Sequence, residues 1–237
     1  MTVYKTERLI NCRSLAGYAC AGGVTSRCAV RCGVPSGADE ADFALIKELG
    51  IKTVIDLRGD KEAAERPSPF AGREGIDCLH FSLLEASPAL NARMLPMWEV
   101  YKMSLTGYAG NYARLLGAIS DLDSPFLFHC FLGKDRTGIL SALLLGIAGA
   151  DREDILRDYE ISFPLIEPFI RRETEADSGL IWEQDISRLR SDRENMERTL
   201  DWLGEEYNGI SGYLRYAGLP PAKEKNIFRL MTEKTER

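Results

Sequence analysis

Residues 125–150 read PFLFHCFLGKDRTGILSALLLGIAGA, and this stretch decides the fold. It opens with Pro125 and three apolar residues, a short run typical of a strand that is buried on both faces of a sheet. Residues 129–138 then bring together a histidine, a cysteine, three charges and two glycines. The nearly apolar run at 138–150 is too short to span a bilayer and predicts a buried helix. The stretch therefore predicts a strand, a polar loop and a buried helix, in that order.

Strand and helix patterns alternate along the chain before this stretch. Strand candidates lie at 24–32, 53–57 and 76–83, and helix candidates at 38–49, 89–104 and 108–122. Ser36 is expected to cap the first helix, with Asp39 three residues on. Such alternation is typical of an α/β fold with a central, mostly parallel sheet flanked by helices. In such sheets ligands bind beyond the carboxyl ends of the strands, where both 56–58 and 129–138 fall.

The chain after residue 150 is predicted to be largely helical. Asp151 with Asp154 is expected to cap one helix, apolar residues recur at helical spacing over 192–207, and Pro220 with Pro221 precedes a last helix. We expect these apolar stripes to belong to the core. No internal repeat, low-complexity tract or long linker divides the sequence. Residues 1–237 are therefore predicted to form a single domain with a helical carboxyl-terminal part.

The charge balance narrows the classes of partner. The chain has 30 basic and 36 acidic residues and a formal net charge of −6. Because of this negative net charge, we do not expect the protein to bind nucleic acid or anionic membranes in general. An anionic ligand would have to bind at a local cluster of positive charge. The first twelve residues, MTVYKTERLINC, lack the apolar core of a secretory signal, and no integral membrane segment is visible. A cytoplasmic location is the expectation, with non-classical secretion left open.

The cysteine spacing argues against a structural metal site. Four of the six cysteines lie early in the chain, at Cys12, Cys20, Cys28 and Cys32. Their gaps of seven, seven and three residues lack the C-x2-C pairs of zinc sites, and both histidines are distant. We expect reduced, mostly packed thiols, and we predict neither a metal nor a cofactor.

The loop after the buried strand has the composition of a phosphate-binding site. Cys130 and Arg136 flank five residues between a strand and a helix start. The backbone N–H groups of such a loop can surround three phosphate oxygens, and the amino end of the helix adds a positive dipole. Gly133 allows the loop to turn tightly, while Phe131 and Leu132 complete the cradle. Helix amino ends and nearby cations also favour the nucleophilic thiolate form of a cysteine.

These residue types support a catalytic role for the loop. A Cys130 thiolate could attack phosphorus, and the planar fork of Arg136 could hold two phosphate oxygens. Asp135 is the nearest carboxylic acid and could protonate the leaving group. Lys134 adds a second positive charge, and Thr137 follows directly. The simpler alternative is a buried cysteine at an ordinary strand-to-helix turn, which leaves the charge placement unexplained.

Other chemistries use a similar loop. An arsenate reductase would need a resolving thiol near Cys130, for which Cys78 is the mid-chain candidate. A sulfurtransferase would need the thiolate but not Asp135. A module that binds phosphate without cleaving it would need neither the thiolate nor the acid. The presence of both favours hydrolysis.

The sequence resembles a known family. HCFLGKDRTG resembles the HC-x2-GKDRTG signature of the bacterial tyrosine and dual-specificity phosphatases typified by mycobacterial and Listeria members, and this loop is also similar to that of phosphoinositide phosphatases. Residues 11–17 resemble the family's N-F-R-D-L-G-G stretch, with Cys12 and Ser14 as departures. Residues 49–58 resemble its L-G-I-x-x-V-x-D-L-R strand, which Glu62 follows, and residues 212–219 its G-Y-L-R-x-A-G-[IL] stretch.

The resemblance implies a phosphatase fold and a set of roles. Cys130 would form a phosphocysteine intermediate, and Asp56 and Arg58 would lie near the pocket rim, in catalytic support or orientation. Asp56 is the alternative general acid. Some relatives have a helical lid over the site, and residues 163–193, which include Phe169, Ile181 and Trp182, form either such a lid or an ordinary packed subdomain. Phosphotyrosine is the preferred substrate, with phosphoinositides or inositol phosphates as the alternative.

Overall fold

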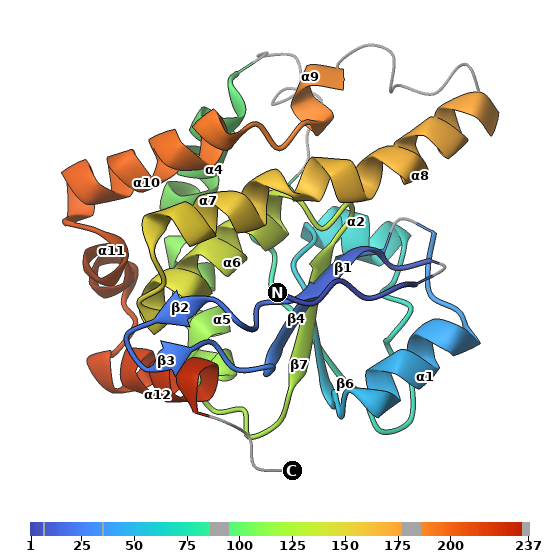
Figure 1. The fold of residues 1–237 in the computed structure, drawn as a ribbon, viewed down its shortest axis with the longest axis horizontal. Coiled ribbons are helices and arrows are strands. Elements are labelled where there is room, and N and C mark those ends of the chain that lie inside the picture. The colour runs from blue at the N-terminus through green and yellow to red at the C-terminus, as the bar shows by residue number, and fades with distance from the viewer. Residues whose placement is uncertain (7, 35, 86–94, 177–185, 234–237) are drawn as a thin grey trace.

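A five-stranded sheet lies at the centre of the structure, a computed structural model that describes residues 1–6, 8–34, 36–85, 95–176 and 186–233 (Figure 1). In spatial order its strands are β1 (Ile10–Ser14), β4 (Ala29–Gly33), β7 (Phe126–Cys130), β5 (Thr53–Asp56) and β6 (Asp77–His80). The last four are parallel neighbours, whereas β1 pairs with β4 antiparallel. The predicted α/β fold with a mostly parallel sheet is confirmed. A small hairpin, β2 (Ala19–Cys20) and β3 (Gly23–Val24), lies apart from this sheet.

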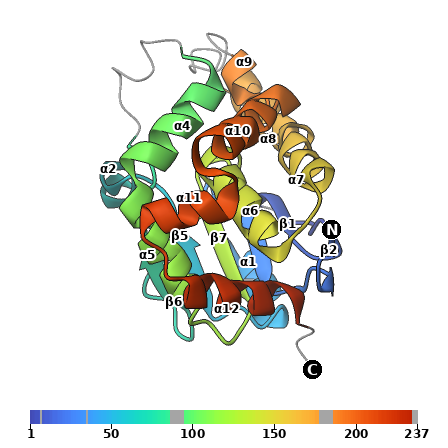
Figure 2. The ribbon, with the colours of Figure 1, turned by 90° about the vertical axis from the view of Figure 1, so that its left-hand side faces the viewer.

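Helices cover both faces of the sheet (Figures 1 and 2). On one side of the sheet, a core shared with the strands includes residues of α4 (Met97–Gly107), α5 (Ala109–Ile119), α6 (Asp135–Ala148), α7 (Arg152–Glu160), α10 (Arg193–Tyr207), α11 (Ile210–Ala217) and α12 (Pro221–Thr232). The opposite face packs against α1 (Glu40–Glu48). The described residues also form α2 (Asp60–Glu65), α8 (Ser162–Ala176) and α9 (Ile186–Leu189).

The alternation of side chains along β7 explains its wholly apolar sequence. Phe126 and Phe128 lie in the core that contains α6, while Leu127 lies in the core that contains Ile46 of α1. Successive residues of a strand point to opposite faces, so a central strand covered by helices must be apolar at every position. The apolar run after the loop forms α6, which is buried on most sides because it lies between the sheet and α7, α11 and α12.

The start of α1 differs from the prediction. The cap is Asp39 and not Ser36, and the helix begins at Glu40. The Asp39 carboxylate accepts hydrogen bonds from the backbone N–H groups of Ala41 and Asp42, and the Asp42 side chain accepts one from the Asp39 N–H. This reciprocal capping box satisfies donors that a cap at Ser36 would leave unpaired.

Only the second part of the helix predicted over 89–104 lies within the described residues. Residues 86–94 lie outside the described part, and α4 starts at Met97, directly after Pro96. Proline disfavours the helical conformation of the residue before it, here Leu95, so the helix cannot extend backwards through this position. The strand predicted over 24–32 is shorter: β4 covers only Ala29–Gly33, while Val24 belongs to the separate hairpin strand β3. The remaining predicted strands and helices are present among the described residues, with shifted ends.

The carboxyl-terminal helices follow the predicted stripes. Met196 and Leu203 of α10 and Ile227 and Met231 of α12 are buried in the main core. Within 163–193, α8 and α9 are described, whereas Ile181 and Trp182 lie outside the described residues. Among the described helices, none is long and apolar enough to cross a bilayer.

Candidate active site

Cys130 lies at the carboxyl end of the central strand β7, beside the end of β5. Asp56, the last residue of β5, is in register with His129. The Cys130 side chain is almost fully buried, and the hydroxyl of Thr137, in the first turn of α6, donates a hydrogen bond of 3.1 Å to its Sγ. Because α6 begins at Asp135, its unpaired N–H groups and positive dipole end face the loop. The predicted order of strand, loop and helix is therefore present.

The loop turns at Gly133, which has a φ of +67°. A Cβ placed on this residue would lie 2.5 Å from the carbonyl carbon of Cys32 and 2.6 Å from the backbone nitrogen of Gly33. A Cβ on Gly33 would in turn lie 2.5 Å from the carbonyl carbon of Leu132. Two glycines thus allow the loop to rest directly on the end of β4, and both are needed for this approach.

Arg136 is held by a bidentate ion pair with Glu62 of α2. Its Nη1 and Nη2 donate to the two carboxylate oxygens at 2.5 and 3.2 Å, and Nη1 also donates to the carbonyl of Leu84 at 3.3 Å. Burial opposes the charge of Arg136, but Cys130 and Glu62 outweigh this effect and raise its pKa. The pairing fixes the plane of the guanidinium at the entrance of α6, where the fork is suited to bind two oxygens of a phosphate.

Asp135 and Lys134 form a second pair beside the loop. The Lys134 Nζ donates to Asp135 Oδ1 at 2.6 Å and to the carbonyl of Arg188 at 3.0 Å, and its side chain is fully buried. The hydroxyl of Tyr101 donates to the same Asp135 oxygen at 2.5 Å and lies 2.6 Å from the hydroxyl of Tyr159. About a third of the Asp135 side chain is exposed. One carboxylate oxygen is thus fixed, while the carboxyl group keeps access to solvent.

Asp56 and Arg58 are buried and pair with each other. The guanidinium of Arg58 donates to both Asp56 oxygens at 2.7–3.1 Å, and its backbone N–H donates to one of them at 3.0 Å. Burial would raise the pKa of Asp56, but the bonds from Arg58 and the nearby His129 hold it below the usual value. The two residues expected at the rim therefore lie beneath the surface, at the end of β5.

His129 is buried under the loop. Its Nε2 lies 3.1 Å from the hydroxyl of Ser68, and its Nδ1 lies 3.8 Å from an oxygen of Asp56. Burial lowers the pKa of His129 to about 4, although Asp56 acts in the opposite direction. The imidazole is therefore neutral at neutral pH and links the ends of β5 and β7 to the 66–70 turn.

Helix α8 packs on the outer side of the loop. Leu132 forms a small apolar cluster with Ile166, Phe169 and Ile170 of this helix. The Lys134 bond to the carbonyl of Arg188 adds a contact with α9. The described parts of 163–193 thus cover the loop in this structure.

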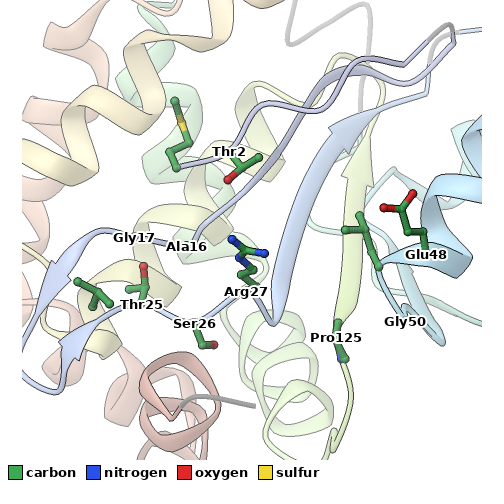
Figure 3. A pocket seen from close by; sticks show the side chains of 12 residues that line it. Thr2, Ala16, Gly17, Thr25, Ser26, Arg27, Glu48, Gly50 and Pro125 are labelled. Atoms are coloured by element: carbon green, nitrogen blue, oxygen red, sulfur yellow. The ribbon is translucent and has the colours of Figure 1, made fainter. Parts of the chain in front are cut away.

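A cavity of about 840 Å³ opens at the other end of the sheet (Figure 3). It is lined by residues that include Arg27, Glu48 and Pro125, the last of which precedes β7. Figure 3 shows Arg27 and Glu48 on opposite sides of this hollow. Among the described residues that line it, none carries a thiol or an imidazole. The chemistry therefore points to the loop at the carboxyl end of β7, and not to this hollow, as the candidate active site.

A model of the tyrosine phosphatase family matches residues 4–233, nearly the whole chain. The chain belongs to this family. The family assignment that the sequence resemblance implied is therefore confirmed.

Two relatives show how far the similarity of this family member extends. A tyrosine-protein phosphatase of Nostoc commune is 30% identical over 193 residues, which cover 76% of this chain and 66% of the relative. The triple specificity protein phosphatase PtpB of Mycobacterium tuberculosis is 28% identical over 237 residues, which cover 79% of this chain and 84% of the relative. Among solved structures, the core catalytic domain of the PP-IP phosphatase SIW14 from S. cerevisiae, in complex with citrate, is 17% identical with a TM-score of 0.39 and covers 76% of this chain and 98% of its own.

Several residues around the loop of this family member had no predicted role. The sequence marks Glu62 only by its position after the 49–58 stretch; an acid shortly after a strand that ends beside the loop is the signal that points to it. Tyr101 lies in a helix whose sequence reads as ordinary core. Arg31 and Asp158, which are fully or almost fully buried, lie in a strand and a helix where charged residues are usually assumed to face water.

Proposed function

We propose that the protein is a cysteine-dependent phosphatase that hydrolyses phosphotyrosine in proteins through a phosphocysteine intermediate on Cys130. The observation that carries this proposal is the arrangement of Cys130 and Arg136 at the two ends of one loop, with Thr137 on the thiol and Glu62 on the guanidinium. A thiolate and an aligned arginine fork at the amino end of a helix are suited to attack and hold a phosphate. Family membership supports the reaction class.

The first step transfers the phosphoryl group to the protein. The phosphate sits on the loop N–H groups and on Arg136, where its negative charge meets the helix dipole. The Cys130 thiolate attacks phosphorus, so that an S–P bond forms while the bond between phosphorus and the leaving oxygen breaks. Asp135 donates a proton to the departing phenolate.

The second step restores the thiolate. Asp135, now ionised, accepts a proton from a water molecule that attacks phosphorus. The S–P bond breaks, Cys130 leaves as a thiolate, and inorganic phosphate departs from the loop. The hydroxyl of Thr137, which donates to Sγ in the structure, stabilises the negative charge that develops on sulfur as the S–P bond breaks.

The hydrogen bonds support Asp135 rather than Asp56 as the acid. Both oxygens of Asp56 are occupied by Arg58, and the carboxyl group is buried. An acid held in this way is strongly biased toward the charged form and cannot readily donate a proton. Asp135 has one oxygen bound to Lys134 and Tyr101 and retains partial exposure.

The position of Lys134 supports a substrate with a single phosphate. Its ammonium is buried between Asp135 and the carbonyl of Arg188, so it is engaged before any substrate arrives. A second phosphate on an inositol ring would have to break both bonds. Phosphotyrosine, which presents one phosphate on an aromatic ring, requires no such change.

A substrate panel with matched variants tests the proposal. The purified protein should hydrolyse an aryl phosphate and phosphotyrosine peptides in the presence of a metal chelator, and Cys130→Ser should abolish turnover while phosphate binding persists. Phosphoinositides and inositol phosphates in the same panel should react more slowly. Full activity of Cys130→Ser, or an absolute need for a divalent metal, would overturn the mechanism; faster hydrolysis of the inositol compounds would overturn the substrate assignment.

A further inference from the structure

Two side chains from outside the loop bind its backbone carbonyls from below. The carbonyl oxygen of Gly133 accepts a hydrogen bond of 2.6 Å from Arg31 Nη2 on β4 and one of 2.7 Å from Asn11 Nδ2 on β1. The same Asn11 amide lies 3.4 Å from the carbonyl oxygen of Leu132. Both donors are buried, with Arg31 fully excluded from solvent. These contacts fix two successive peptide groups at the turn of the loop.

The direction of these carbonyls decides where the loop N–H groups point. In a trans peptide the C=O and N–H bonds are antiparallel, and the described chain contains no cis peptide bond. When the carbonyls of Leu132 and Gly133 point toward Asn11 and Arg31, the N–H groups of Gly133 and Lys134 must point to the opposite side. That side is the one on which a phosphate would lie in the cradle proposed above.

The two donors are themselves rigidly held. Arg31 Nη1 donates to Asp158 of α7, and Arg13 Nε donates to the other oxygen of the same carboxylate at 3.0 Å. Arg13 also donates to the side-chain oxygen of Asn11, which fixes the orientation of the Asn11 amide. Asn11 has a φ of +55°, a conformation that asparagine tolerates better than most residues. Elements far apart in the sequence thus meet beneath the loop.

This cluster carries an excess of positive charge. Two guanidinium groups share one carboxylate, and the side chains of Arg13, Arg31 and Asp158 are at most 1% exposed. Burial would raise the pKa of Asp158, but the two arginines hold it below its usual value; burial and Arg13 lower the pKa of Arg31 to about 10. Arg31 and Asp158 therefore remain charged at neutral pH, and because two guanidinium groups share one carboxylate, an uncompensated positive charge lies directly behind the loop. It favours an anion on the other side of the loop.

We propose that Arg31 and Asn11 are positioning residues that aim the Gly133 and Lys134 N–H groups at the substrate phosphate. The proposal rests on the function assigned to the loop. Arg31 never touches the substrate in this arrangement. It acts through the Gly133 peptide, and the charge it shares with Arg13 and Asp158 strengthens the same anion site.

Three variants separate this role from simple stability. Arg31→Met removes the donor and leaves Arg13 and Asp158 as a neutral pair, so the fold should survive. Arg31→Lys keeps the charge but lacks the planar fork that reaches Asp158 and Gly133 together. Tyr18→Phe is the matched control, because the Tyr18 hydroxyl donates to Asp158 at 3.1 Å but to no loop atom. Circular dichroism and thermal unfolding would verify that each variant is folded.

The readout is the binding of tungstate, an oxyanion similar to phosphate, followed by amide NMR. In the wild type, the Gly133 and Lys134 amide protons should shift downfield as tungstate is added. Arg31→Met should weaken binding by about 10- to 100-fold and lose these two shifts, Arg31→Lys should weaken it less, and Tyr18→Phe should match the wild type. If Arg31→Met fails to fold, Asn11→Gly tests the same role, because it removes the amide donor to the Gly133 carbonyl while glycine tolerates the positive φ. It should weaken tungstate binding and lose the same two amide shifts.

The outcomes distinguish this proposal from the proposed function. Wild-type affinity and wild-type amide shifts in folded Arg31→Met or Asn11→Gly would overturn the positioning role while leaving the phosphatase assignment intact. Equal weakening in Tyr18→Phe would show that the effect is general loosening, and would also overturn it. Failure of the wild type to bind tungstate would instead remove the anion cradle on which both proposals depend.

Discussion

Glu62 and Arg136 form a bidentate ion pair that joins α2 to the start of α6, with N–O distances of 2.5 and 3.2 Å. Both side chains are partly accessible, at 27% and 12% exposure, so the pair lies where a substrate could reach it. In the proposed mechanism, phosphate binding uses the same guanidinium. The ion pair therefore fixes the plane of the Arg136 guanidinium. It does not use all five N–H donors of the group, so a phosphate can still bind to it.

Glu62→Gln should reduce kcat/KM for an aryl phosphate by about 10- to 100-fold, because the uncharged amide no longer accepts two charge-assisted bonds and Arg136 loses its fixed orientation. Steady-state kinetics measure this loss. The control is Glu65→Gln on the same helix, whose carboxylate is largely exposed and lies 3.9 Å from Lys61. Equal effects of the two substitutions would mean that Arg136 does not depend on Glu62.

Asp135→Asn should slow the hydrolysis of substrates with poor leaving groups by about 10²- to 10⁴-fold, since only these need a proton in the transition state. Substrates whose leaving group is already a weak base should be affected far less. A series of aryl phosphates with different leaving-group pKa values measures this dependence. Asp56→Asn is the comparison, and leaving-group selectivity in that variant instead would transfer the acid role to β5.

The strand, the loop and α6 could be predicted because their signals are local. The apolar run at 125–128, Gly133 and the spacing from Cys130 to Arg136 all lie within a few residues of one another. The mostly parallel sheet followed from the alternation of elements, and the position of Asp56 beside β7 followed from the sheet. Local patterns of this kind survive because tertiary contacts reinforce them.

The supporting residues could not be found in this way because their partners are far apart in sequence. Arg31 and Asp158 are separated by 127 positions, and Glu62 and Arg136 by 74. Nothing in the segment around Arg31 marks it as buried, since arginine is usually exposed. The error at Ser36 had a different cause, because two residues could cap α1 and the competition was decided by Asp42.

Gly133→Ala should destabilise the protein by about 2–4 kcal/mol, because the new Cβ would be strained at positive φ and would collide with the backbone of β4. Urea unfolding measures the change. Gly117→Ala in α5 is the matched control: apart from the backbone of its own helix, no atom of the described residues lies within 4 Å of its Cβ position, so the substitution should stabilise the helix by about 0.5–1 kcal/mol. Equal stability of the two variants would show that the loop does not rest on β4 as described.

Acid should weaken the fold through His129. Its pKa is lowered from 6.5 to about 4, mainly by burial. Between these values the unfolded chain binds a proton that the folded chain does not, so the free energy of unfolding falls as the pH is lowered from about 6.5 to about 4 and then levels off for this group. The loss amounts to about 3 kcal/mol.

Urea unfolding of the wild type and of His129→Gln across this range measures the contribution of the histidine. The variant cannot take up the proton on unfolding, so its stability should depend less on pH between about 4 and 6.5, whatever stability it has at pH 7. His80→Gln is the control, because His80 is the chain's other histidine and its side chain is 37% exposed. A pH dependence that disappears in His80→Gln, but persists in His129→Gln, would contradict the burial of a neutral imidazole beneath Cys130.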